Sequence, residues 1–250
     1  MKLLVFGTAG YHPNETRDTA CLMLPEQGIV LDAGSGMFRV RGEIVTSTLD
    51  IFLSHAHLDH IVGLTYLLDV LHGREMSRVT VHGEQEKLDA VRDHLFSKHL
   101  FPVDPPFESA PLMVGAAQPL AHGGQIRSFW LPHPGGSVGY RLDWDDCSMA
   151  YVTDTTASAD ADYVDVIRGV DLLVHECNFT DELQDQAVLT GHSHTTPVAE
   201  VAAKAEVGQL LMVHINPLAT GDDPVHLGKA RRIFSQTSVA HDGQVIEFGN

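Results

Sequence analysis

Cysteine is scarce in this chain of 250 residues, which has only Cys21, Cys147 and Cys177. Their odd number and wide spacing argue against a disulfide framework and against a CxxC metal site. We therefore expect the three thiols to be buried and to pack as small apolar side chains.

Basic residues are also few, because 16 Lys and Arg stand against 33 Asp and Glu, for a formal net charge of −17. No basic cluster occurs. Proteins that bind a nucleic-acid backbone usually display a basic surface. The charge balance therefore argues against a large polyanionic substrate, although a small anionic one remains compatible with it.

Long apolar runs are absent. No stretch approaches the roughly 18 apolar residues of a membrane-spanning helix, so no membrane partner is expected. The start, Met1–Gly7, leads into a glycine turn and predicts a strand instead of a signal peptide. A cytoplasmic location is the default expectation. Repeats are also lacking, and an apolar content of 44% favours a single domain over residues 1–250.

Short β-branched runs alternate with longer helical patterns. The predicted strands are Lys2–Phe6, Ala20–Leu24, Ile29–Asp32, Ile51–Leu53, Val79–His82, Ile126–Leu131, Val138–Asp143, Met149–Val152, Leu172–His175, Leu210–His214 and Val245–Phe248. The predicted helices are Ile61–His72, Glu84–Lys98, Ala159–Arg168, Pro197–Ala205 and Pro224–Ser235. This order predicts an α/β fold with helices on the outer faces of sheets. The proline-rich Leu100–Pro119 segment is expected to be an irregular insertion or a lid.

Histidine is abundant, with 16 residues, and its spacing is informative where an apolar strand runs into His55, His57, Asp59 and His60. In extended backbone, side chains two positions apart point the same way, so His55 and His57 can share one metal. Asp59 and His60 follow as the chain turns toward a helix, and can reach a second metal. A carboxylate mixed with imidazoles suits Zn²⁺, Mn²⁺ or Fe²⁺.

Three more candidate ligands, His133, Asp154 and His214, each follow an apolar predicted strand. Strand ends at one edge of a sheet can gather polar side chains on short loops. Catalytic zinc sites use about three protein ligands for each metal and leave a position for water. We therefore expect these residues to complete the metal site.

This pattern resembles the metallo-β-lactamase superfamily, whose signature is His55-x-His57-x-Asp59-His60 followed by single His, Asp and His ligands. Gly7-Thr8 and the stretch 31–36 also resemble its early glycine turns. The resemblance implies a four-layer αββα sandwich and two divalent metal ions, with zinc favoured and manganese or iron as alternatives. Histidine at position 57, where glutamate would indicate the di-iron flavoprotein branch, favours hydrolysis.

The resemblance also implies a ligand assignment. The first metal would be held by His55, His57 and His133, the second by Asp59, His60 and His214, and Asp154 would bridge the two.

Two further stretches resemble ribonuclease Z and the phosphodiesterases of its branch. Leu173–Phe179 is similar to a His-Glu-Ala-Thr-Phe motif, and Gly191–Thr196 to a Gly-His-Ser-Thr stretch. The resemblance implies that a histidine oriented by Glu176 protonates the departing alcohol. His194 is the preferred candidate because it directly precedes two threonines and a helix, with His192 as the alternative.

The same resemblance gives Asp59 a catalytic part, together with Asp154, in orienting a hydroxide. Ser137 and Thr195 are candidate donors to the oxygens of a phosphate substrate. The chain is shorter than ribonuclease Z usually is, and lacks a Gly- and Lys-rich arm. Its length is closer to the compact cyclic phosphodiesterases of the phosphonate pathway.

Four functions are therefore compared. A phosphodiesterase for a small or cyclic phosphodiester is favoured. The alternatives are a transfer-RNA 3′-processing endonuclease and a carboxylic-ester hydrolase such as a lactonase, thioesterase or β-lactamase. A non-catalytic binding module is disfavoured by the full set of seven ligands. The resemblance also makes a homodimer an expectation.

Overall fold

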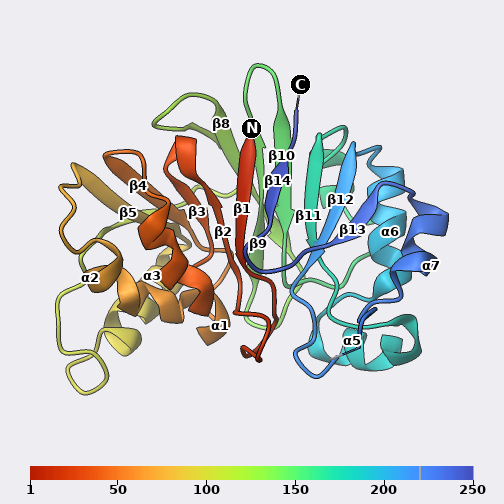
Figure 1. Cartoon of the computed structure of the whole chain (residues 1–250), viewed down its shortest axis with the longest axis horizontal. Helices are drawn as coiled ribbons and strands as arrows, with labels where there is room; N and C mark the ends of the chain where they lie inside the picture. Colours follow the sequence, from red (N-terminus) through yellow and green to blue (C-terminus); the bar gives the residue numbers. More distant parts are fainter. Residues whose placement is uncertain (220, 250) are drawn as a thin grey trace. The chain divides into compact units, whose positions relative to one another are not determined.

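The computed structural model describes residues 1–219 and 221–249 and divides into two compact units (Figure 1). The N-terminal unit contains Lys2–Met113 and His241–Glu247. The C-terminal unit contains Met1, Val114–Ala240 and residues 248–249. Each unit is built on one seven-stranded sheet.

The sheet of the N-terminal unit has the order β14-β1-β2-β3-β4-β5-β6. Its strands are β1 Lys2–Gly7, β2 Cys21–Leu24, β3 Ile29–Leu31, β4 Thr48–Phe52, β5 Arg78–Gly83, β6 Glu108–Pro111 and β14 Val245–Glu247. Strands β3 to β6 run parallel, whereas β14, β1, β2 and β3 pair antiparallel. The carboxyl ends of β3 and β4 therefore lie side by side, and the segment 54–60 begins there.

The helical turns of this unit are short. They are η1 Pro25–Gln27, η2 Ser35–Gly42, α1 Leu58–Ile61, η3 Val62–Tyr66, α2 Leu67–Val70, α3 Gln85–Ala90 and the π-helical turn η4 Val91–Leu95. The prediction of one helix over Ile61–His72 is wrong in its continuity. The amide of Gly63 donates to the carbonyl of Ala33 at 2.7 Å, so a tertiary bond interrupts the helix. A Cβ at Gly63 would lie 2.2 Å from the carbonyl oxygen of Gly34, so this approach requires glycine.

The sheet of the C-terminal unit has the order β13-β12-β11-β10-β9-β8-β7. Its strands are β7 Ala117–Pro119, β8 Gln125–Leu131, β9 Ser137–Asp143, β10 Ser148–Val152, β11 Leu172–Glu176, β12 Gln209–Val213 and β13 Thr237–Val239. Strands β10 to β13 are parallel. Asp154, Glu176 and His214 therefore lie at or just beyond the carboxyl ends of three adjacent strands.

The helices of this unit are α4 Tyr163–Val166, η5 Asp181–Leu183, α5 Gln184–Thr190, α6 Thr195–Lys204 and α7 Leu227–Ile233. Helix α6 buries Val198, Ala199, Val201 and Ala202 in one core cluster with Leu173 and Leu210 of the sheet. Figure 1 shows α6 and α7 beside β12 and β13. This packing holds the loops that follow β11 and β12 in place.

The Leu100–Pro119 segment is more regular than its prolines predicted, because β6 and β7 fall within it and form the edges of the two sheets. Pro111 and Pro119 end these edge strands, where proline is tolerated. The three cysteines are buried and reduced, as expected. Among the described residues, no helix is long and apolar enough to cross a membrane.

Candidate metal centre

The N-terminal unit gathers three histidines and an aspartate in the loop after β4. The ring of His55 lies 4.4 Å from that of His57 and 4.3 Å from that of His60, measured between centroids. Nε2 of His60 is 3.4 Å from Oδ2 of Asp59. This geometry brings together the four side chains that the sequence motif singled out.

A buried carboxylate supports this cluster from behind. Asp32, just beyond β3, accepts a hydrogen bond from Nδ1 of His60 at 2.8 Å and two from Ser54, through its amide and its hydroxyl. The Ser54 hydroxyl also lies 3.0 Å from Nδ1 of His55. These Nδ1 partners orient both imidazoles through the nitrogen opposite Nε2, which is the usual arrangement behind histidine ligands of a metal.

Asp32 and Ser54 were not among the predicted site residues. Their position in the sequence could have indicated this role. Asp32 directly follows β3, and because β3 and β4 are parallel neighbours, it must lie beside the segment that follows β4.

The C-terminal unit gathers His133, Asp154 and His214, whose side chains are each only 2% exposed. Nε2 of His133 is 3.6 Å from Oδ2 of Asp154, and Nε2 of His214 is 3.3 Å from Oδ1 of the same carboxylate. Asp154 therefore presents one oxygen to each imidazole. This arrangement is suited to a carboxylate that bridges two cations.

Backbone conformation at the strand ends is unusual. Asp32, Asp154 and His214 have φ values of +57°, +52° and +56°. Non-glycine residues rarely adopt this left-handed conformation, although Asp and His do so more often than most. Such strain concentrates at functional sites. Asp154 and His214 belong to the second cluster and Asp32 supports the first, and Tyr11, Glu206 and His226 share the same conformation elsewhere.

The orientation of His133 is set by a turn distant in sequence. Its Nδ1 donates to the carbonyl of Gly191 at 2.9 Å, which directs Nε2 toward Asp154. Burial lowers the pKa of His133 below its ordinary value, although Asp154 and the Gly191 carbonyl oppose this effect. The neutral imidazole, which is the form that binds metals, is therefore favoured.

His192 is the histidine that contacts Glu176. Its Nδ1 lies 3.0 Å from Oε1 of the carboxylate, and its ring lies 5.2 Å from those of His133 and His214. Glu176 is fully buried and also accepts the amides of Thr155 and Ser193. The expected contact of Glu176 with His194 is wrong, because Nδ1 of His194 lies 2.6 Å from Asp181 instead.

Ser137 and Thr195 lie in the interior of the C-terminal unit. Both are completely buried, and their hydroxyls donate to the carbonyls of Thr153 and Val225. These bonds hold loops in place and leave neither hydroxyl facing an open site. The expectation that they bind phosphate oxygens therefore finds no support in their geometry.

The donor chemistry of both clusters fits a divalent metal. Imidazole nitrogens with carboxylate oxygens suit zinc and its neighbours. Within the C-terminal unit, ligand atoms of Asp154, His192 and His214 lie within 4.8 Å of one another and could hold one ion. His192 can therefore act either as a ligand or as an acid, because a bond from Nδ1 to a carboxylate orients an imidazole for either role.

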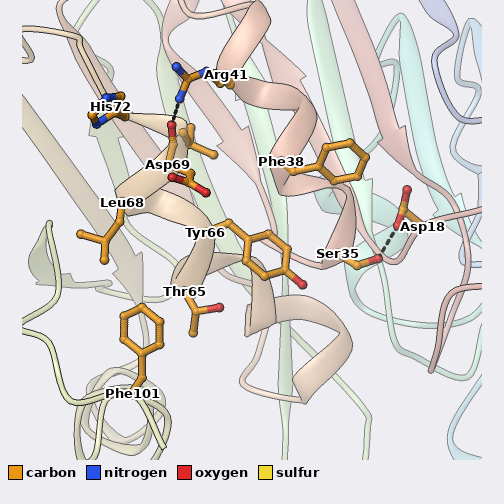
Figure 2. Close-up of a pocket in the computed structure, with 11 residues that line it drawn as sticks. Asp18, Ser35, Phe38, Arg41, Thr65, Tyr66, Leu68, Asp69, His72 and Phe101 are labelled. Atoms are coloured by element: carbon orange, nitrogen blue, oxygen red, sulfur yellow. Dashed lines mark hydrogen bonds between the residues drawn. The ribbon is translucent and has the colours of Figure 1, made fainter.

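A separate groove of about 1040 Å³ lies in the N-terminal unit (Figure 2). Phe38, Tyr66 and Phe101 supply its aromatic lining. Two of its polar contacts join wall residues to each other, since Ser35 donates to Asp18 and Arg41 to the backbone of Asp69. The groove thus offers apolar surface, without a pair of groups arranged for acid–base chemistry.

Comparison with known proteins gives a consistent assignment. The family model described as "Beta-lactamase superfamily domain" matches residues 28–215. A ribonuclease Z from Gemmatimonas aurantiaca is 26% identical over 307 aligned positions, which cover 99% of this chain and 96% of that protein. The match spans both units.

Solved structures agree on the fold. The metallo-beta-lactamase fold protein YhfI from Bacillus subtilis has a TM-score of 0.81 at 20% identity, with 98% of this chain and 99% of that chain covered. A diphosphatase from the PhnP family has a TM-score of 0.71 at 20% identity, covering 99% and 97%. The predicted α/β fold of the metallo-β-lactamase type is thereby confirmed.

Proposed function

The chain belongs to the β-lactamase superfamily, and from that premise we propose that it is a metal-dependent hydrolase that cleaves a small or cyclic phosphodiester. The observation that carries the proposal is the buried Glu176 bonded to His192 beside Asp154 and His214. Hydrolysis of a thioester releases a thiolate, which has little need for such a proton donor. An alkoxide leaving a phosphodiester requires one.

We propose that the two clusters together supply the ligands of two divalent ions, with zinc favoured over manganese or iron. The ligands are those expected from the sequence: His55, His57, Asp59, His60, His133, Asp154 and His214. Ions held there would lower the pKa of a water toward neutrality and offset negative charge on the phosphoryl group.

The side chains of the protein then have distinct tasks. The water gives one proton to bulk solvent, and the resulting hydroxide adds to phosphorus as the bond from phosphorus to the leaving oxygen breaks. Nε2 of His192 gives its proton to that oxygen, while Glu176 accepts from Nδ1 and stabilises the imidazolium that precedes transfer. Asp59, held by the amide of Tyr11 at 2.8 Å, and Asp154 orient the attacking water.

Cleavage of a precursor transfer RNA is the second candidate, because curated relatives named ribonuclease Z match nearly the whole chain. The net charge of −17 disfavours it, since a long phosphate backbone requires positive neutralising charge. The two candidates share the same chemistry and differ in the size of the substrate.

Turnover assays distinguish these functions. Protein loaded with Zn²⁺ or Mn²⁺ should hydrolyse bis-p-nitrophenyl phosphate and cyclic nucleotides, and should not cleave a precursor transfer RNA at moderate salt. Cleavage of that RNA would favour the second candidate. Turnover confined to lactones or thioesters would overturn the phosphodiesterase proposal.

We also propose that residues 1–250 act as one catalytic domain, located in the cytoplasm and forming a homodimer. Analytical ultracentrifugation checks the last point, for which a sedimentation coefficient of a single 27.2 kDa chain would count against a dimer.

A further inference from the structure

A small pocket of about 220 Å³ opens in the C-terminal unit between the loop after β11, helix α5 and the loop after β12. Asn178, Thr180, Gln186 and Asn216 give it polar walls, and Leu183 and Leu218 give it apolar ones. At about 30 Å³ for each water in the liquid, this volume corresponds to roughly seven waters. Its volume therefore suits one ring-bearing group.

The lining of this pocket carries no charge. Its nine residues are all neutral, in a chain whose net charge is −17. A phosphate or carboxylate would find no cation there, whereas the carboxamide of Gln186 offers a donor and an acceptor. Side-chain amides pair with the edges of nucleobases for the same reason. Asn178 donates to His214 and Asn216 accepts from Leu218, so each can offer a ligand only its remaining donor or acceptor atoms. Leu183 and Leu218, which are 46% and 79% exposed, leave apolar surface for the face of a ring.

Two wall residues of the pocket lie beside residues of the candidate metal centre. Asn178, which is 6% exposed, donates to the backbone carbonyl of His214 at 3.0 Å. Phe179 has its ring 6.5 Å from that of His192. The pocket therefore adjoins the side of the site where the proposed acid stands, which is where the leaving alcohol departs.

We propose that this pocket binds the nucleobase of a small phosphodiester whose leaving alcohol belongs to the same nucleoside. The inference rests on the proposed phosphodiesterase function and names its substrate class. Gln186 is the side chain with which to test it, because it is exposed on α5 and lines the pocket. It is outside the set of proposed metal ligands.

The experiment compares uridine 2′,3′-cyclic phosphate with glycerol 1,2-cyclic phosphate. Both have a five-membered cyclic phosphodiester, and only the first carries a base. The metal-loaded protein should show a KM at least about tenfold lower for the uridine ester, and Gln186→Leu should reduce that preference about fivefold, the value of one neutral hydrogen bond. Gln184→Leu, on the same helix and outside the pocket, should leave the preference unchanged.

A second variant, Leu183→Glu, places a charge at the pocket and should reduce the preference as well. Equal KM values for the two esters, or equal effects of Gln186→Leu and Gln184→Leu, would overturn the assignment. Saturation-transfer NMR with uridine separates this inference from the proposed function. If the protein hydrolyses neither ester, the proposed phosphodiesterase function is wrong. If uridine does not bind, or binds equally well to the Gln186→Leu variant, the assignment of the pocket to a nucleobase is wrong.

Discussion

Three histidines of one unit show how a hydrogen-bond partner determines the role of a side chain. His133 is bonded to a backbone carbonyl, His192 to the buried Glu176 and His194 to Asp181. His192 and His194 lie in the same short motif, so the sequence alone left them as alternatives for the acid. Only the fold shows which of them Glu176 reaches.

Replacement of His192 tests its role as an acid. We expect His192→Ala to lower kcat at least about 100-fold for an ester that releases an alkoxide, because general acids contribute about that much. The effect should be small for a p-nitrophenyl ester, since p-nitrophenolate departs without a proton. A pair of kcat measurements on uridine 2′,3′-cyclic phosphate and bis-p-nitrophenyl phosphate checks this.

His194→Ala is the matched control, two residues away on the same turn. It should affect the two esters equally. A larger difference between the esters for His194→Ala than for His192→Ala would restore His194 as the acid.

Asp181 is a residue that sequence reasoning missed. It accepts hydrogen bonds from the amide of Thr196 at 2.8 Å, from the Thr196 hydroxyl and from His194, and it pairs with Lys229. Burial acts to raise the pKa of Asp181, but hydrogen bonds from Lys229, Thr196 and His194 outweigh burial and hold the pKa well below its ordinary value. The ionised carboxylate thus ties η5 to the start of α6.

We expect Asp181→Asn to reduce the free energy of unfolding at pH 7 by about 1–3 kcal/mol, the usual value of hydrogen bonds to a charged group. Because the folded-state pKa is depressed, the stabilisation is present above the unfolded pKa of about 3.9 and is lost as pH falls below it. Urea unfolding of both proteins from pH 7 to pH 3 should show the difference shrinking. Asp185→Asn, an exposed change on α5, should have little effect at any pH.

At the scale of elements, the turn between α5 and α6 contacts both the candidate metal ligands and the proposed acid. Residues 191–194 supply the carbonyl that orients His133, the imidazole of His192 and the amide of Ser193 that bonds Glu176. Gly191 begins the turn with φ +77°, and a Cβ there would lie 2.3 Å from Cδ of Pro134. Only glycine fits this position without displacing the chain beside His133.

Gly191→Ala should therefore weaken folding and metal binding together. Gly169→Ala is the matched control, because Gly169 has φ +69° and nothing within 4 Å of its Cβ position. Gly169→Ala should lower the free energy of unfolding by about 1 kcal/mol, because alanine is strained in left-handed backbone. Gly191→Ala should lower it by about 1–3 kcal/mol more, because its Cβ also clashes with Pro134. Zinc affinity, measured by competition with a chelator, should fall about tenfold or more for Gly191→Ala and stay unchanged for Gly169→Ala. Loss of a hydrogen-bond partner that orients a metal ligand usually has an effect of that size. Equal zinc affinities of the two variants would contradict the coupling.

Strands were predicted from the sequence more accurately than helices. Met149–Val152, Leu172–His175 and Leu210–His214 each agree with an observed strand within one residue at either end, because buried parallel strands are continuous apolar runs. The helix predicted over Ile61–His72 is instead a series of short turns, since the bond from Gly63 to Ala33 depends on contacts distant in sequence. The helix predicted over Glu84–Lys98 is present as α3 and the adjoining π-helical turn η4. Asp32 was likewise missed as a support for His60, because its partner lies 28 positions away.

At the scale of the whole molecule, the protein is strongly acidic, with a formal net charge of −17, and the proposed metal ions would offset part of that charge. Metal bound only by the folded chain must stabilise it by mass action. We expect removal of metal with a chelator to lower Tm by several degrees, and restoration of Zn²⁺ to reverse the change, as thermal unfolding in matched buffers would show. A Tm that is indifferent to the chelator would mean that the ligands bind no ion tightly.

The most direct test of the central claim is the metal content of the purified chain, measured by inductively coupled plasma mass spectrometry alongside phosphodiester turnover. The account requires about two transition-metal ions in each active chain, as in other two-metal hydrolases, and a loss of both metal and activity in Asp154→Ala. Full turnover by a chain without transition metal, or an Asp154→Ala variant that keeps both ions and full activity, would contradict it.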